Sequence, residues 1–509
     1  MILRLAALAL ALLAPGIAHA EWHEASTKHF VVYADDRPET IEKFASELER
    51  FNMAMAAFYP NALKAAEGPA NRVTVFVLAG NGVEKLTGDS FTRGFYIPRA
   101  GGNVAFVPKV SGRSESWELS GAAVLRHEYA HHFMYTRFPA VFPMWFSEGS
   151  AEFWSTVLYN KDGSMHVGMV PQHRGFGLLS GNPLPLEKLL TVTNQKLSGE
   201  QREAIYGRGW LLTHYLTVDP ARQKLLIAYM AALNRGEPLE KAAAALCDLK
   251  QLARELERYM RGRMPAMRLP SERIGGASVA LRKLTPGEVA TMAVRIRSKR
   301  GVDEAEAKRV LADARKATAP FPSDPGAQVA LAEAEFDAGN YALAGAAADR
   351  ALATNAKLGE ALLYRAMAKF ELASAGESTS ETWKDVRRAI VAANRNDPED
   401  PRPLILYYRS FGAEGVPAPE AAKQGLAKAY EVAPSDLGLR MNAAIMFLSD
   451  KKPAEAREAL RLIAYDPHGG GLAAKARAMV AAIERGEPAD KVLAAKPAGA
   501  EADTDSGSD

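Results

Sequence analysis

The sequence predicts two parts: an α+β domain, followed by an all-α solenoid of helical repeats. Short β-type segments alternate with helix-period segments in the first half of the chain. From about residue 277 the pattern is helical throughout, and breakers recur at intervals close to 34 residues. A chain of 509 residues also exceeds what one hydrophobic core usually organises, which favours more than one domain.

Residues 1–20 have the pattern of a secretory signal peptide. Arg4 supplies the positive start, residues 5–13 the apolar stretch, and Ala18-His19-Ala20 a small-x-small cleavage site. We expect cleavage after Ala20 and a periplasmic or secreted mature protein. An uncleaved anchor is the alternative, but the apolar run is shorter than the ~20 residues that a membrane span needs, and no later span is expected.

Composition narrows the classes of function. The net charge of +3 is small for this length and no long Lys/Arg cluster occurs, so nucleic acid is not expected as a partner. The single cysteine, Cys247, excludes an intramolecular disulfide. It is expected to be a small buried hydrophobic residue.

The first domain is expected to span residues 21–270. Strands are predicted at residues 30–33 and 73–78 and a helix at 37–58. A hairpin is predicted around residues 99–103, and Pro98, which lacks a ladder donor, places its first strand at a sheet edge. Further helices are expected at 117–138, from Met144 onward and through most of 186–263.

Gly and Pro are dense over residues 262–276, which we predict as the domain boundary. The repeats are expected over 277–490. Residues 331–351, with Gly-Asn-Tyr at the turn, resemble one tetratricopeptide repeat. Repeat ends spaced by 34, 42, 36 and 33 residues fall at Pro322, Ala356, Pro398, Pro434 and Pro467. The extra residues of the 42-residue interval are assigned to a polar loop at 373–380. The alternative to stacked repeats is a non-repetitive helical domain. The acidic tail at 491–509 is expected to be disordered.

The segment His127-Glu128-Tyr129-Ala130-His131 predicts a metal site. Histidines four residues apart lie on one face of a helix, which suits zinc, a metal that prefers neutral imidazole nitrogens and leaves one position of a catalytic site to water. Glu128 stands beside the first ligand, where it is able to take a proton from that water.

Glu148 follows His131 after sixteen intervening residues. It shares a helix face with Glu152, and the turn marked by Pro139 and Pro143 allows that face to fold back against the histidines.

With these residues the sequence resembles the gluzincin metallopeptidases of thermolysin-like fold, above all the peptidase-MA-like domains that accompany tetratricopeptide repeats. The resemblance implies zinc (Zn2+) held by His127, His131 and Glu148, with Glu128 as general base. It also implies that Glu152 holds a ligand histidine. The gap of sixteen residues is shorter than the eighteen of the aminopeptidase motif, which leaves Glu152 open as the third ligand.

The resemblance further implies a tyrosine or histidine that stabilises the oxyanion, and Tyr206 is favoured over His214. His132 is expected to be a flanking or core residue. His166 and His173 are expected at the surface. Core positions are expected for the large aromatic residues Trp117, Trp145, Phe153 and Trp154.

The predicted function is therefore that of an exported zinc metallopeptidase. A peptide or protein is its substrate, and the repeats bind that substrate or a partner protein. The alternative is a non-catalytic envelope scaffold with a vestigial or structural metallopeptidase domain. We also expect the two halves to be separable near residue 267, because they follow different structural periods.

Overall fold

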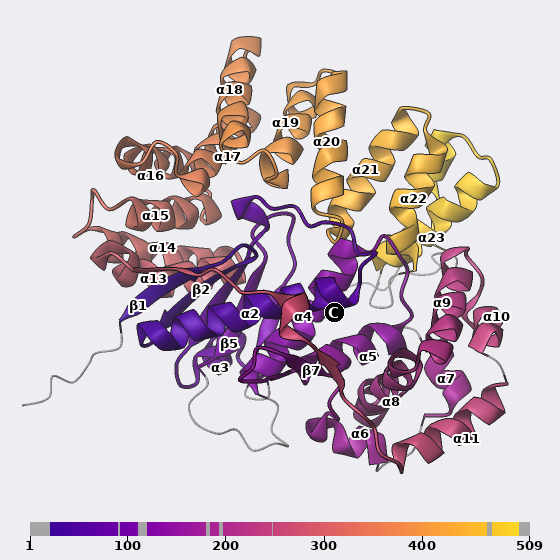
Figure 1. The fold of residues 1–509 in the computed structure, drawn as a ribbon. Coiled ribbons are helices and arrows are strands. Elements are labelled where there is room, and N and C mark those ends of the chain that lie inside the picture. The colour runs from indigo at the N-terminus through magenta and orange to yellow at the C-terminus, as the bar shows by residue number, and fades with distance from the viewer. Residues whose placement is uncertain are drawn as a thin grey trace, which may run out of the picture.

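The computed structural model describes residues 21–89, 92–109, 120–179, 184–192, 197–246, 248–465 and 471–497. The predictions for the signal peptide, Trp117, Cys247, the repeat end at Pro467 and the chain beyond residue 497 lie outside these residues. A sheet and a cluster of helices form the first half of the molecule, and the helices of the second half form an arc over them (Figure 1).

The main sheet has six strands in the order β4-β5-β3-β2-β1-β9. Its strands are β1 (Trp22–Ser26), β2 (Phe30–Asp35), β3 (Val73–Leu78), β4 (Phe95–Ile97), β5 (Val104–Pro108) and β9 (Ala280–Lys283). The adjacent strands β2, β3 and β5 are parallel, whereas β4 pairs antiparallel with β5 and lies at the edge. The predicted hairpin and its edge position are confirmed; β1 and β9 were not predicted.

Apolar side chains cover both faces of this sheet. Val32 and Val75 point to one face, where α2 (Pro38–Phe58) and α4 (Gly121–Arg137) pack. Phe76 and Phe106 point to the other face, against α3 (Gly82–Thr87) and Met292 of α13 (Pro286–Arg300). The parallel strands β2, β3 and β5 are largely buried on both sides, as is usual for parallel sheets.

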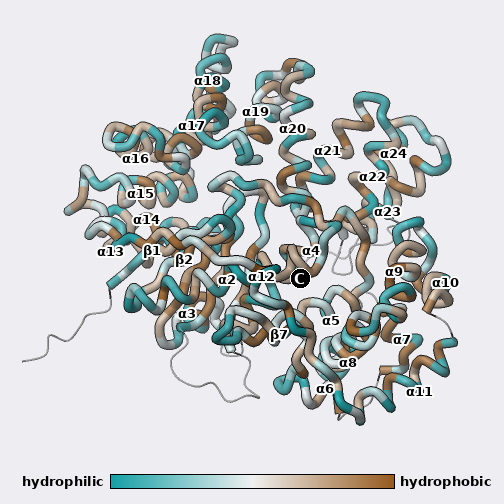
Figure 2. The backbone as a smooth tube through the Cα atoms, viewed as in Figure 1, coloured by the Kyte–Doolittle hydropathy of each residue, from teal (hydrophilic) through white to brown (hydrophobic). Residues whose placement is uncertain are grey.

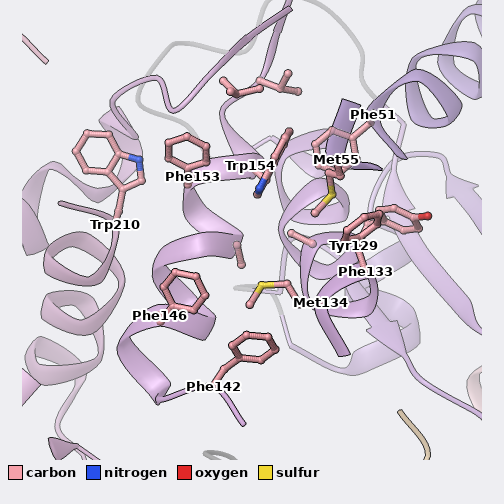
Figure 3. Close-up of a cluster of buried hydrophobic side chains, with 14 of the residues drawn as sticks. Phe51, Met55, Tyr129, Phe133, Met134, Phe142, Phe146, Phe153, Trp154 and Trp210 are labelled. Carbon is pink, nitrogen blue, oxygen red and sulfur yellow. The ribbon is translucent and has the colours of Figure 1, made fainter. Parts of the chain in front are cut away.

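A second group of helices packs beside α4. Helix α5 (Met144–Ser155) begins directly after Pro143 and crosses α8 (Gly199–Val218). Figure 3 shows the aromatic core around α5, with Phe153 on the side of Trp210 of α8 and Trp154 on the side of Phe51 and Met55 of α2. As predicted, Trp145, Phe153 and Trp154 are buried.

Smaller elements complete this half. A three-stranded sheet consists of β6 (Leu158–Tyr159), β7 (Met165–Val167) and β8 (Met267–Leu269). The remaining helices are η1 (Pro69–Asn71), η2 (Gln172–Arg174), α6 (Gly175–Leu179), α7 (Leu186–Thr191), α9 (Pro220–Asn234), α10 (Leu239–Ala243), η3 (Ala244–Leu246), α11 (Leu249–Met260) and α12 (Ser271–Ile274).

Helices that pack in sequence order form the second half. After α13 they are α14 (Glu304–Thr318), α15 (Pro325–Asp337), α16 (Tyr341–Thr354), α17 (Gly359–Ala375), α18 (Ser380–Asn396), α19 (Pro401–Glu414), α20 (Glu420–Val432), α21 (Leu437–Ser449), α22 (Pro453–Ala464), α23 (Gly471–Glu484) and α24 (Ala489–Ala494). This is the predicted helical solenoid. In Figure 2 its helices alternate between teal and brown, as amphipathic helices do.

Three predicted boundaries differ from the structure. Ala280–Lys283 was assigned to the repeats but pairs with β1 as strand β9, so the sheet ends later than residue 270. The extra residues of the long repeat lie mainly in its helices and not in its loop: α17 and α18 have 17 residues each, against 13 and 14 in α15 and α16. Residues 491–494, placed in the tail, belong to α24.

The inner side of the arc contacts the first half. The backbone N–H groups of Glu67 and Gly68 donate to Glu399, and that of Ala100 donates to Asp436. Farther along, Arg461 of α22 donates to Asn234 and to the carbonyl of Pro139. Figure 1 shows the arc running along the left and upper border of the first half from α13 to α23. Among the described residues, no helix has the length and hydropathy of a membrane span.

Candidate metal centre

Helices α4 and α5 bring the predicted metal ligands together. Ser120 caps the start of α4 by accepting a hydrogen bond from the N–H of Ala123. One turn of α4 separates His127 from His131, which places both rings on one side. The turn before Pro143 returns the chain, so that Glu148 of α5 faces them.

Three donor atoms form a nearly equilateral triangle. The Nε2 atoms of His127 and His131 are 3.2 Å apart, and Oε2 of Glu148 lies 3.3 Å from the first and 3.4 Å from the second. In a tetrahedral zinc site with bonds of about 2.0–2.1 Å, ligand atoms lie about 3.3–3.4 Å apart. The spacing and the chemistry of this donor set therefore fit zinc.

The carboxylates make the site attractive to a cation. Burial disfavours the protonated ring of His127. Hydrogen bonds that this ring donates to the carboxylates of Glu148 and Glu152 outweigh the burial and raise the pKa of His127 to about 10. The same negative charge would favour a metal ion, which competes with protons for the ring nitrogen.

Glu152 lies on the opposite side of the His127 ring. Its Oε1 is 3.3 Å from Nδ1 of His127, and it also contacts His173 and Arg174. Burial disfavours its charge, yet contacts with His127, His173 and Arg174 hold its pKa well below the usual range. Glu152 is thus placed to orient His127 rather than to join the three donor atoms.

The prediction for His173 is wrong, because its side chain is only 9% exposed and its Nε2 lies 3.0 Å from Oε2 of Glu152. His166 is half-buried and contacts Asn160. Sequence reasoning also missed Arg174, which donates to Glu152 from η2. The segment of η2 has no periodic pattern in the sequence, so the positive charge of Arg174 is the only feature that could have indicated a role in the site.

His131 has its own contacts. Oγ of Ser147 lies 3.2 Å from its Nδ1, and the hydroxyl of Tyr135 lies 2.7 Å from that Oγ. Sequence analysis did not select Ser147, although it precedes Glu148 directly. Both sides of the triangle are therefore held by neighbouring side chains.

Glu128 and Tyr206 border the same cavity as the triangle, whereas His214 does not. His214 is fully buried beside Tyr259, at 3.0 Å from its hydroxyl. The ring of Tyr206 lies 5.8 Å from that of His127, with the Arg174 guanidinium 4.2 Å from its centroid. Burial, aided by Glu148, raises the pKa of Tyr206, so its hydroxyl stays protonated and able to donate.

His132 also borders the cavity but is not one of the three donor residues. Its Nδ1 lies 2.7 Å from the hydroxyl of Tyr96 on β4. Burial lowers the pKa of His132 to about 3, so the ring is neutral. This is consistent with the predicted role as a flanking residue.

Two glycines allow α5 and α8 to approach closely. A Cβ on Gly149 would lie 2.3 Å from the carbonyl oxygen of Gly209, and one on Gly209 would lie 2.6 Å from that of Trp145. The crossing stands next to Glu148 and one turn from Tyr206. It thus places the α8 tyrosine beside the ligand face of α4 and α5.

The cavity has a volume of about 400 Å³ and walls from both halves of the chain. One wall carries the triangle, Glu128, Tyr206 and the edge strand residue Tyr96. The opposite wall comes from the repeats and includes Leu437 and Arg440 of α21 and Leu462 of α22. The sequence placed these residues in a separable domain, so their part in the site was not predicted.

Comparisons with known proteins add little to this description. No family model matches the chain, and no curated protein matches it. Solved structures similar to it include a thermophilic tetratricopeptide-repeat protein of Thermus thermophilus, with 16% identity over 38% of this chain and 95% of that one, and a TM-score of 0.30. Another is pilF of Pseudomonas aeruginosa, with 16% identity over 41% and 90%, and a TM-score of 0.32.

Proposed function

We propose that this protein is an exported zinc metallopeptidase that hydrolyses peptide bonds. The observation that carries the proposal is the triangle of two imidazole nitrogens and one carboxylate oxygen, with zinc-ligand spacing, in the wall of a cavity that Glu128 also lines. The signal-like residues 1–20 support an extracytoplasmic location.

His127, His131 and Glu148 would hold the metal. When bound, zinc polarises the scissile carbonyl and lowers the pKa of water toward neutrality. The Glu128 carboxylate accepts the proton of the attacking water and passes it to the leaving amine nitrogen, which balances the hydrolysis. Tyr206 donates its phenolic proton in a hydrogen bond to the oxygen that becomes negative at the tetrahedral carbon.

The edge strand β4 would hold the substrate main chain. It lies at the end of the sheet, and its residue Tyr96 and the following Pro98 border the cavity. An extended peptide is able to pair with such an edge, because its free backbone groups form a template for another strand. The repeat wall would then contact the substrate side chains.

Metal content and peptide cleavage test the proposal together. The mature protein is expected to contain one zinc per chain by elemental analysis and to cleave members of an unbiased peptide library. Glu128→Gln should keep the zinc and lower turnover by ~10² or more, the scale of general-base catalysis.

Absence of zinc from the wild-type protein would contradict the ligand assignment. Zinc without cleavage of any library peptide would favour a scaffold with a structural metal site. Equal turnover in wild type and Glu128→Gln would show that another group accepts the proton.

A further inference from the structure

Arg440 is a buried arginine in the repeat wall of the cavity. It belongs to α21, is 2% exposed and borders the cavity from the repeat side. Among the described residues, no Asp or Glu lies within ion-pair distance of its guanidinium. Every other feature of this wall is apolar or uncharged, including Leu437, Leu462 and Ser435.

Two of the three guanidinium nitrogens of Arg440 donate hydrogen bonds to uncharged groups. Nε donates to the carbonyl of Pro434, and Nη1 donates to the hydroxyl of Tyr430 at 3.2 Å. Nη2 has no hydrogen-bond partner within the part of the chain that the structure describes. These contacts fix the plane of the guanidinium and leave donor capacity unused.

Burying the positive charge of Arg440 is unfavourable in free energy unless a bound anion compensates that charge. Burial lowers the pKa of Arg440, but an arginine remains protonated in proteins. A guanidinium whose orientation is already fixed suits a carboxylate, because its parallel N–H groups match the two oxygens. The charge of Glu458 acts on Arg440 from a distance, but no carboxylate of the described residues forms an ion pair with it.

Arg440 and the three donor atoms border the same cavity, which limits the ligands that are able to contact both. Both border one cavity of about 400 Å³, the triangle from α4 and α5 and Arg440 from α21. A peptide that reaches both must carry a carboxylate apart from its reacting carbonyl, within the span of this cavity. Apolar side chains such as Phe142 and Leu462 also line this cavity.

We propose that Arg440 binds a carboxylate of the peptide substrate, so that the repeats select peptides with a nearby negative charge. This inference rests on the proposed function for the nature of the substrate. The carboxylate comes either from the peptide C-terminus or from an acidic side chain, two sources that share the same chemistry and are separable by experiment.

Binding to the zinc-loaded Glu128→Gln protein tests the inference without turnover. The probes are hexapeptides of Ala, Leu and Phe, each with a free C-terminal acid or a C-terminal amide, and amidated versions with an internal Glu or Gln. Calorimetry should show tighter binding by about ten- to a hundredfold for one carboxylate form over its neutral partner, the range of charged hydrogen bonds. The pair that differs identifies the source.

Substitution assigns this preference to Arg440. Arg440→Gln, added to Glu128→Gln, should abolish the preference while neutral peptides bind unchanged. Arg440→Lys, which keeps the charge but not the planar fork, should retain a weaker preference. Arg461→Gln is the matched control, because Arg461 contacts the first half from the neighbouring helix α22 but does not border the cavity.

Equal binding of acid and neutral peptides, or a preference that persists in Arg440→Gln, overturns the inference. If Arg440→Gln does not fold, a full preference in Arg440→Lys overturns it instead. Cleavage by wild type without any carboxylate preference would leave the proposed function standing alone. If the protein cleaves no peptide but shows a carboxylate preference that depends on Arg440, the carboxylate site stands and the proposed peptidase function falls.

Discussion

The orientation of His127 depends on a chain of charged side chains behind the triangle. Glu152 contacts Nδ1 of His127 and is held in turn by His173 and Arg174. A carboxylate on the far nitrogen makes an imidazole a better metal ligand and keeps its Nε2 lone pair directed at the metal. Charge placed outside the triangle therefore contributes to its affinity.

Glu152→Gln should weaken zinc affinity by about 10- to 100-fold, the usual effect of removing such a carboxylate. Competition with a chromogenic chelator measures this. Glu203→Gln is the control, since Glu203 contacts the same Arg174 but not His127. Equal affinities in the two variants would show that Glu152 does not act through the histidine.

The double substitution His127→Ala/His131→Ala should remove zinc from the purified protein, because one carboxylate remains of three ligands. Elemental analysis gives the result. His166→Ala removes a histidine outside the triangle and should keep one zinc per chain. Full zinc in the double variant would place the metal elsewhere.

At the scale of elements, the crossing of α5 and α8 determines the site as much as the motif does. Gly149 directly follows Glu148, and the carbonyl oxygen of Gly209 occupies the place where a Cβ would stand. This close approach lets Tyr206 and the triangle share one cavity wall.

Gly149→Ala should lower the free energy of unfolding by about 1–3 kcal/mol, the usual cost of overpacking, and should also reduce zinc retention. Thermal unfolding and metal content measure both. Gly175→Ala is the control, because a Cβ there meets no atom within 4 Å and Gly175 has helical backbone angles. Similar losses in the two variants would exclude the close contact as the cause.

At the scale of the molecule, the repeats form part of the first half's structure. Strand β9 pairs with β1, and Met292 of α13 packs on the aromatic face of the sheet with Tyr33, Phe76 and Phe106. Arg295 of α13 stacks on Tyr33 at 4.3 Å from the ring centroid. The predicted separation near residue 267 therefore cuts through a packed core.

A chain ending at Met267 should bind hydrophobic dyes and associate, because it lacks β9 and α13 and exposes that aromatic face. A chain ending at Thr318 keeps both elements and should remain monomeric with a normal zinc content. Dye fluorescence and sedimentation compare them. Equal behaviour of the two chains would show that the first half folds without β9 and α13.

The sequence alone determined the features that depend on near neighbours. Residues four apart on a helix share a face, so the motif around His127 predicted that His127 and His131 point to the same side. The turn at Pro143 predicted that Glu148 folds back toward them. The hairpin at an edge and the helical period of the repeats were also readable, because strands and helices carry their own periodicities.

Only the tertiary structure decided which distant segments meet. Nothing near His173, Arg174 or Arg440 in the sequence marks them as neighbours of the cavity, since contacts between distant segments follow from the packing of whole elements. Strand β9 was assigned to the repeats for the same reason: its partner β1 lies more than two hundred residues earlier. The spacing of the donor atoms arises when α4 packs on α5, and the repeat wall of the cavity arises when the two halves pack. No local pattern encodes either packing.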